Sequence, residues 1–165
     1  GFSTQNATFP QPHLPNGQPH GLASMTISDS REGWVESTRA LIKSYMQEDQ
    51  MQDIVFDYSL IRAKGVALRG FGGTASGPQP LIDLHTRLHQ YFAHASYVHV
   101  PRSRLIADVF NAIGACVVAV KIRRSAELAT GRIGDDTFLN LKNYALHPER
   151  ASIGWMSNNS VLLAE

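Results

Sequence analysis

The residues best suited to bind an anion lie in one glycine-rich stretch, IRAKGVALRGFGGTASGP, at positions 61–78. Arginine grips phosphate through a planar guanidinium group, and glycine lets backbone N–H groups approach a phosphate closely. The sequence matches neither the GxGxxG nor the GxxxxGK[ST] phosphate pattern, so a solvated surface loop is the alternative. The residues of this stretch predicted to bind phosphate are Arg62, Lys64, Arg69, Gly70, Gly72 and Gly73.

A second cationic segment, KIRRSA, occupies residues 121–126 and could present Arg123 and Arg124, with Ser125 beside them, to an anion. The alternative is a strand end with two solvated cations. Ligands of α/β proteins bind outside the carboxyl ends of parallel strands. Because each cationic segment follows a predicted strand, at 54–58 and at 116–120, the sequence predicts that the two segments occupy equivalent places in the fold.

The remaining reactive side chains favour structural roles. His85 and His89 lie four residues apart on a predicted helix and share a face, but a zinc site needs three or four ligands and the HExxH motif is absent. Cys116 precedes an apolar run, which is typical of a small buried hydrophobic residue. We therefore assign no catalytic residue and no metal ligand.

Predicted strands alternate with predicted helices along the chain. The alternation favours an α/β fold with largely parallel pairing. Asp29, with Glu32 three residues later, could cap the first helix. The predicted strands are 1–9, 23–27, 54–58, 116–120 and 158–163, the predicted helices are 29–46, 80–92, 103–116 and a short one within 134–143, and the main predicted loops are 10–20, 59–78 and 147–155.

Composition limits the possible partners. The 165 residues carry a net charge of +1, so no overall field recruits nucleic acid or an anionic membrane. No apolar run reaches the roughly 20 residues that span a bilayer, no signal peptide is visible, and the single cysteine fits a reducing, cytoplasmic location. The chain opens with GFSTQ and closes with SNNSVLLAE, which indicates a piece of a longer protein.

Five stretches resemble the adenosylcobalamin (B12)-dependent class II ribonucleotide reductases, especially the monomeric ribonucleoside-triphosphate type. The resemblance implies radical replacement of the ribose 2′-hydroxyl by hydrogen, for DNA synthesis, in a ten-stranded α/β barrel. Residues 1–165 would be a single segment in the first half of that barrel. The matching stretches are GFSTQ (1–5), DSREGW (29–34), DYSLIRAKGVALRGFGGTASGPQPLIDLH (57–85), CVVAVKIRRSAELATG (116–131) and NLKNYALHPERASIGWMSNNSV (140–161).

The resemblance also implies roles for two specificity loops, at about 59–78 and 119–126. Arg62 and Arg69 match arginines associated with the phosphates of a deoxynucleoside triphosphate effector, and Arg123 matches one associated with the ribonucleotide substrate. The family usually has two small residues before the arginines of the second loop, where this chain has Val120 and Lys121.

The resemblance places the reactive cysteines, and most contacts to adenosylcobalamin, outside residues 1–165. The complete enzyme would use a thioredoxin-type reductant, and the isolated fragment would be inactive. The alternative is a non-catalytic nucleotide-binding module of a split or truncated protein. Substrate phosphorylation, effector preference and the choice between monomer and homodimer stay open.

Overall fold

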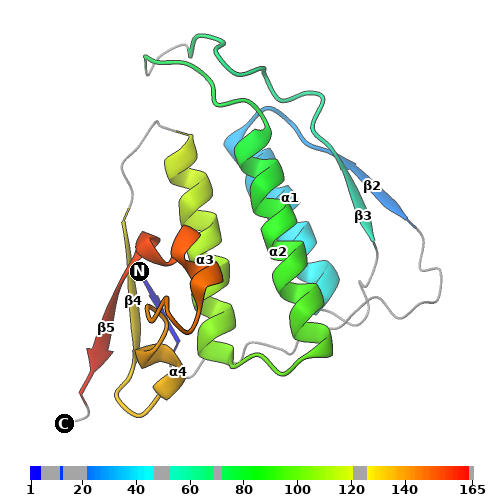
Figure 1. Cartoon of the computed structure of the whole chain (residues 1–165). Helices are drawn as coiled ribbons and strands as arrows, with labels where there is room; N and C mark the ends of the chain where they lie inside the picture. Colours follow the sequence, from blue (N-terminus) through cyan, green and yellow to red (C-terminus); the bar gives the residue numbers. More distant parts are fainter. Residues whose placement is uncertain (5–11, 13–21, 47–52, 69–71, 121–125, 164–165) are drawn as a thin grey trace.

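Three long helices form the centre of the computed structural model, which describes residues 1–4, 12, 22–46, 53–68, 72–120 and 126–163. The helices are α1 (Arg31–Met46), α2 (Gln79–Tyr97) and α3 (Arg102–Ala119). In Figure 1 one pair of strands lies beside α1 and α2, and a second group of strands lies on the other side, next to α3. The helices therefore separate two small sheets.

Both sheets are parallel. β2 (Ala23–Thr26) pairs with β3 (Ile54–Asp57), with Ala23 opposite Ile54. In the other sheet β4 (Glu127–Arg132) lies between β1 (Phe2–Ser3) and β5 (Ser157–Leu162). Each parallel pair is joined through at least one helix, as parallel strands require. The predicted α/β class with parallel pairing is confirmed.

The main core lies between the three helices. α2 buries a continuous face, and the side chains of Leu88 and Phe92 are completely inaccessible to solvent. Leu41 and Tyr45 of α1 contribute to the same cluster, as do residues of α3. A smaller cluster of Ala107, Ala129, Phe138 and Leu141 joins α3 to β4 and to the short helix α4 (Asp136–Leu139). Apolar residues recur at helical spacing, so burying one face of each helix drives this packing.

The predicted strand at 116–120 is wrong, because Cys116 to Ala119 form the last turn of α3. A short apolar run fits a buried strand and a buried helix equally well. Here the run continues the buried stripe of Leu105, Val109 and Ala112. The actual strand, β4, begins at Glu127 after the second cationic segment. That segment therefore follows a helix and precedes a strand, so the two cationic segments do not occupy equivalent places.

Helix boundaries also differ from the predicted ones. α2 extends to Tyr97 and α3 to Ala119. Ser30, and not Asp29, caps α1, since its Oγ accepts a hydrogen bond from the Gly33 N–H at 3.0 Å. The predicted loop at 147–155 contains two 3-10 turns, η2 (Pro148–Ser152) and η3 (Gly154–Met156).

The other predicted elements lie close to their expected positions. β2, β3 and β5 correspond to the strands predicted at 23–27, 54–58 and 158–163, and α4 lies within 134–143. Of the predicted strand 1–9, residues 5–9 lie outside the described part, as does nearly all of the loop at 10–20. Among the described residues, no helix is long and apolar enough to cross a membrane.

Candidate functional site

The loop from Tyr58 to Pro78 connects β3 to α2 and folds back on itself. The Gly65 N–H donates to the Ala75 carbonyl at 2.9 Å, and the Ala75 N–H donates to the Val66 carbonyl at 2.8 Å. Gly72 and Gly73 have φ values of 68° and 87°. Such left-handed conformations suit glycine and strain other residues. The described part of the loop is thus an irregular hairpin whose shape depends on glycine.

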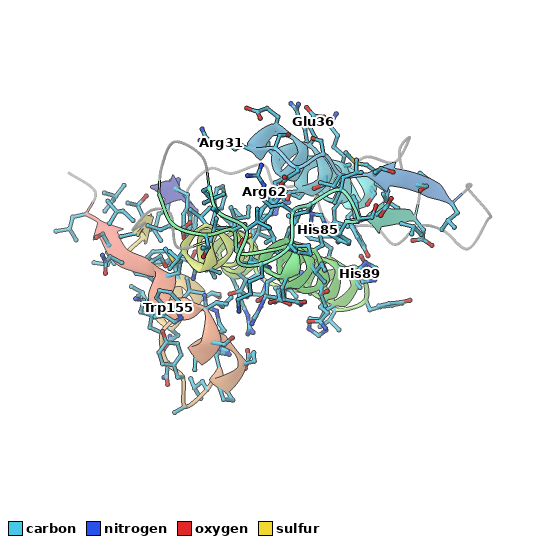
Figure 2. All side chains as sticks on the ribbon, turned by 90° about the horizontal axis from the view of Figure 1, so that it is seen from above. Arg31, Glu36, Arg62, His85, His89 and Trp155 are labelled. Atoms are coloured by element: carbon cyan, nitrogen blue, oxygen red, sulfur yellow. The ribbon has the colours of Figure 1, made fainter. Side chains whose placement is uncertain are left out.

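Arg62 is held at the beginning of this hairpin by an ion pair. Its Nε lies 2.5 Å from Oδ2 of Asp29, which belongs to the turn between β2 and α1. The two residues meet because β2 and β3 are parallel, so the turns that follow them lie at the same end of the sheet. Arg62 keeps 41% of its side chain exposed, so the guanidinium remains accessible. Figure 2 shows Arg62 beside the beginning of α1.

A second carboxylate organises the first turn of the hairpin. Asp57, the last residue of β3, accepts a hydrogen bond from the Ser59 N–H at 2.9 Å and one from Thr26 Oγ1 at 3.4 Å. These bonds, led by the backbone N–H of Ser59, hold the pKa of the Asp57 carboxyl below its usual value. Its charge is therefore engaged locally and anchors the turn.

The predicted site residues are only partly within the described structure. Lys64, Gly72 and Gly73 are exposed on the hairpin, whereas Arg69 and Gly70 lie outside the described residues. Arg123, Arg124 and Ser125 also lie outside them. The elements that flank this second segment are described: α3 ends, and β4 begins, at the same end of the helices as the hairpin (Figure 1). The structure therefore brings the ends of both predicted loops to one end of the molecule.

A polar network that the sequence reasoning missed lies directly below the hairpin. Tyr58 Oη is 2.8 Å from His85 Nδ1, and His85 Nε2 is 3.3 Å from Ser37 Oγ and 3.3 Å from Thr38 Oγ1. Burial lowers the pKa of His85 to about 4, so the ring is neutral at physiological pH. The available signal was the pair of histidines on one face of a helix, with hydroxyl residues on the helix before it.

His89, one turn further along α2, pairs with Tyr45, whose Oη lies 2.5 Å from His89 Nδ1. Figure 2 shows both histidines on α2. Each histidine therefore bonds to the hydroxyl of a tyrosine, which agrees with the structural role predicted for them. The described residues contain no group of three or more histidine, cysteine, aspartate or glutamate side chains that could hold a metal ion.

Glu127 is a second residue that the sequence reasoning did not single out. It begins β4, and its Oε2 is buried with no hydrogen-bond partner among the described residues. Burial raises the pKa of the carboxyl to about 7. Its Oε1 packs against Gly114 of α3. A Cβ at position 114 would lie 2.6 Å from this oxygen, so the position has room only for glycine. An acidic residue directly after the cationic segment was the available signal.

Cys116 is buried in the helical core, which confirms the burial predicted for it. Burial, with a smaller contribution from the charge of Asp83, raises the pKa of the thiol to about 11. The sulfur is therefore a protonated, unreactive thiol at neutral pH.

Comparison with known proteins places this geometry in a family. The family model described as "B12-dependent ribonucleotide reductase, insertion domain" matches residues 11–92, which include the hairpin. A crystal structure of a B12-dependent (class II) ribonucleotide reductase superposes with a TM-score of 0.73 at 32% identity, covering 90% of this chain and 20% of that chain.

Curated relatives agree with this result. The chain is 42% identical to an adenosylcobalamin-dependent ribonucleoside-triphosphate reductase of Euglena gracilis, over 98% of this chain and 22% of the relative. A probable enzyme of the same description from Dictyostelium discoideum is 42% identical over 82% of this chain and 17% of the relative. The adenosylcobalamin-dependent ribonucleoside-triphosphate reductase of Lactobacillus leichmannii is 38% identical, over 82% of this chain and 18% of the relative. The chain thus spans about a fifth of the length of these relatives.

Proposed function

Because this chain belongs to the B12-dependent ribonucleotide reductase family, we propose that it is one segment of an enzyme that reduces ribonucleotides to deoxyribonucleotides. The observation that carries the proposal is the alignment with the Euglena gracilis enzyme over 98% of the chain. Within the complete protein, residues 1–165 would form a single part of the catalytic α/β barrel. A ribonucleotide substrate, a thioredoxin-type reductant and a cytoplasmic location are parts of the same proposal.

The segment itself does not supply the radical chemistry. Adenosylcobalamin, when bound, supplies a radical that a cysteine thiol next to the substrate must accept. The one cysteine of this chain, Cys116, is buried in the helical core, so it does not fit that task. We therefore assign the cobalamin contacts and the reactive cysteines to other parts of the complete enzyme.

The role we propose for this segment is the binding of a deoxynucleoside triphosphate effector by the hairpin. Arg62 supports it, because the ion pair with Asp29 fixes an accessible guanidinium at the carboxyl end of β2 and β3. Lys64 adds an exposed positive charge, and Gly72 and Gly73 are exposed and carry no side chain, so a phosphate could approach their backbone closely. Arg69 and Gly70 complete the proposed effector site. We propose that the second loop couples effector binding to the choice of substrate through Arg123, Arg124 and Ser125.

The test is binding of each of the four deoxynucleoside triphosphates to the complete reductase carrying Arg62→Ala or Arg69→Ala. A charge-assisted hydrogen bond is worth about 1.5–3 kcal/mol, so each variant should bind its preferred effector roughly 10- to 100-fold more weakly. Arg39→Ala is the matched control, because Arg39 is an exposed arginine in the middle of α1. Unchanged effector affinity in both hairpin variants would refute the effector site.

A further inference from the structure

The hairpin is tied to α1 and α2 through a continuous line of hydrogen bonds. Tyr58 is the first residue after β3, and its hydroxyl lies 2.8 Å from His85 Nδ1 on α2. The other ring nitrogen of His85 faces Ser37 and Thr38 of α1, 3.3 Å from each hydroxyl. His85 is 5% exposed and Ser37 is fully buried, so water does not compete for these bonds.

The donors and acceptors in this chain of hydrogen bonds can be assigned in one direction, from Tyr58 to the hydroxyls of α1. Ser37 Oγ donates to the Trp34 carbonyl at 3.0 Å, and Thr38 Oγ1 donates to the same carbonyl at 2.9 Å. A hydroxyl has a single proton, so neither can also donate to His85. Nε2 of His85 must therefore carry the hydrogen, which leaves Nδ1 to accept the proton of Tyr58. The neutral ring that this requires agrees with the lowered pKa of His85.

At its hairpin end, this chain of hydrogen bonds reaches the turn that leads to Arg62. The Tyr58 carbonyl accepts the N–H of Ile61 at 3.0 Å, and Ile61 is 7% exposed. The next residue is Arg62. The ring of Phe56 packs on His85 with centroids 4.4 Å apart, which further fixes the imidazole. Moving Tyr58 would therefore move the turn that presents Arg62.

We propose that His85 is a positioning residue for the effector hairpin: it orients Tyr58, and through Tyr58 the Arg62 turn, by a directed relay from Tyr58 to His85 to the hydroxyls of Ser37 and Thr38. This inference rests on the proposed effector function of the hairpin. It adds a second group of residues, at the interface between α1 and α2, that sets how well the hairpin is prepared for the effector's phosphates.

The test is Tyr58→Phe in the complete reductase, which removes one hydroxyl and keeps the ring. Binding of the preferred deoxynucleoside triphosphate should weaken about 2- to 10-fold, as expected for one neutral hydrogen bond. The kcat at saturating effector should not change. The matched control is Tyr45→Phe, which removes the equivalent tyrosine–histidine bond, with His89, in the same interface but away from the hairpin. This control should bind the effector normally.

A second set of variants tests continuity. Replacing the two acceptors together, by Ser37→Ala with Thr38→Val, should weaken effector binding similarly, and adding Tyr58→Phe should then cost little more, because members of one network are not additive. Nitrogen NMR of the histidine rings should show His85 with hydrogen on Nε2 in the parent protein.

The outcomes separate the relay from the function on which it rests. Weaker binding in Arg62→Ala with normal binding in Tyr58→Phe would overturn the relay and keep the effector site. Equal losses in Tyr58→Phe and Tyr45→Phe would show general loosening of the helix interface and would also overturn the relay. Normal binding in Arg62→Ala, Arg69→Ala and Tyr58→Phe would refute the effector site itself.

Discussion

Arg150 and Asp108 form a buried ion pair that fastens η2 to α3. Arg150 Nε lies 2.6 Å from Asp108 Oδ1, and the two side chains are 2% and 9% exposed. Burial raises the pKa of the Asp108 carboxyl, while the guanidinium groups of Arg150 and Arg104 act in the opposite direction. Arg104 also pairs with Glu149 of η2. Charged contacts therefore join the segment before β5 to α3.

Breaking the Arg150–Asp108 pair should be costly. We expect Arg150→Met to lower the free energy of unfolding by about 3–5 kcal/mol, because Asp108 stays buried without its main partner. Urea unfolding followed by circular dichroism measures this loss. The double variant Asp108→Leu with Arg150→Met should recover most of the stability, since two apolar side chains need no partner. A loss below about 1 kcal/mol in the single variant would contradict a buried pair.

Gly131 of β4 should not tolerate a methyl group. A Cβ at this position would lie 2.3 Å from ring carbons of Phe138, which is itself buried in the smaller cluster. We expect Gly131→Ala to lower the free energy of unfolding by about 1–3 kcal/mol through overpacking. Gly134→Ala is the matched control, because no atom lies within 4 Å of its added Cβ. Equal stabilities of the two variants would show that the ring of Phe138 moves aside freely.

Stability should fall in mild acid because of His85. Burial lowers its pKa to about 4 in the folded protein, whereas an unperturbed histidine has a pKa of 6.5. Between these values the unfolded chain binds a proton that the folded chain does not, so this contribution is complete above pH 6.5 and is lost as the pH falls toward 4. The shift corresponds to about 3 kcal/mol.

The pH experiment needs a reference variant, since other groups titrate in the same range. His85→Asn lacks the imidazole, so its unfolding free energy should depend less steeply on pH between 6.5 and 4. Urea unfolding of both proteins at several pH values gives the difference. Parallel curves would show that His85 is protonated in the folded protein as readily as in the unfolded one.

Local patterns predicted the elements whose buried residues are large. The buried face of α2 was visible in Leu81, Leu84 and Leu88, and β3 in its β-branched and aromatic residues. β4 was missed because its buried positions are Ala129 and Gly131, which are small and give no strong alternation of apolar and polar residues. The run after Cys116 was misassigned because length and hydrophobicity alone do not separate a strand from a helix end.

The candidate site could be predicted as residue types but not as contacts. The cationic, glycine-rich character of residues 61–78 marked the hairpin. The partner of Arg62 depends on the parallel register of β2 and β3, which brings Asp29 to the same edge. The bond between Tyr58 and His85 depends on how α2 is rotated against α1. Both are tertiary relationships that no window of sequence contains.

β4 is the central strand of its sheet, so this sheet cannot form until β4 has been synthesised. Thr4, next to β1, donates its hydroxyl to the carbonyl of Thr130, which lies 126 residues later. At a synthesis rate of about 5–20 residues per second, the amino-terminal strand waits roughly 6–25 seconds on the ribosome before its partner exists. The β2–β3 pair and the α1–α2 interface can form during this interval. The hairpin can therefore assemble before the sheet on the other side of the helices.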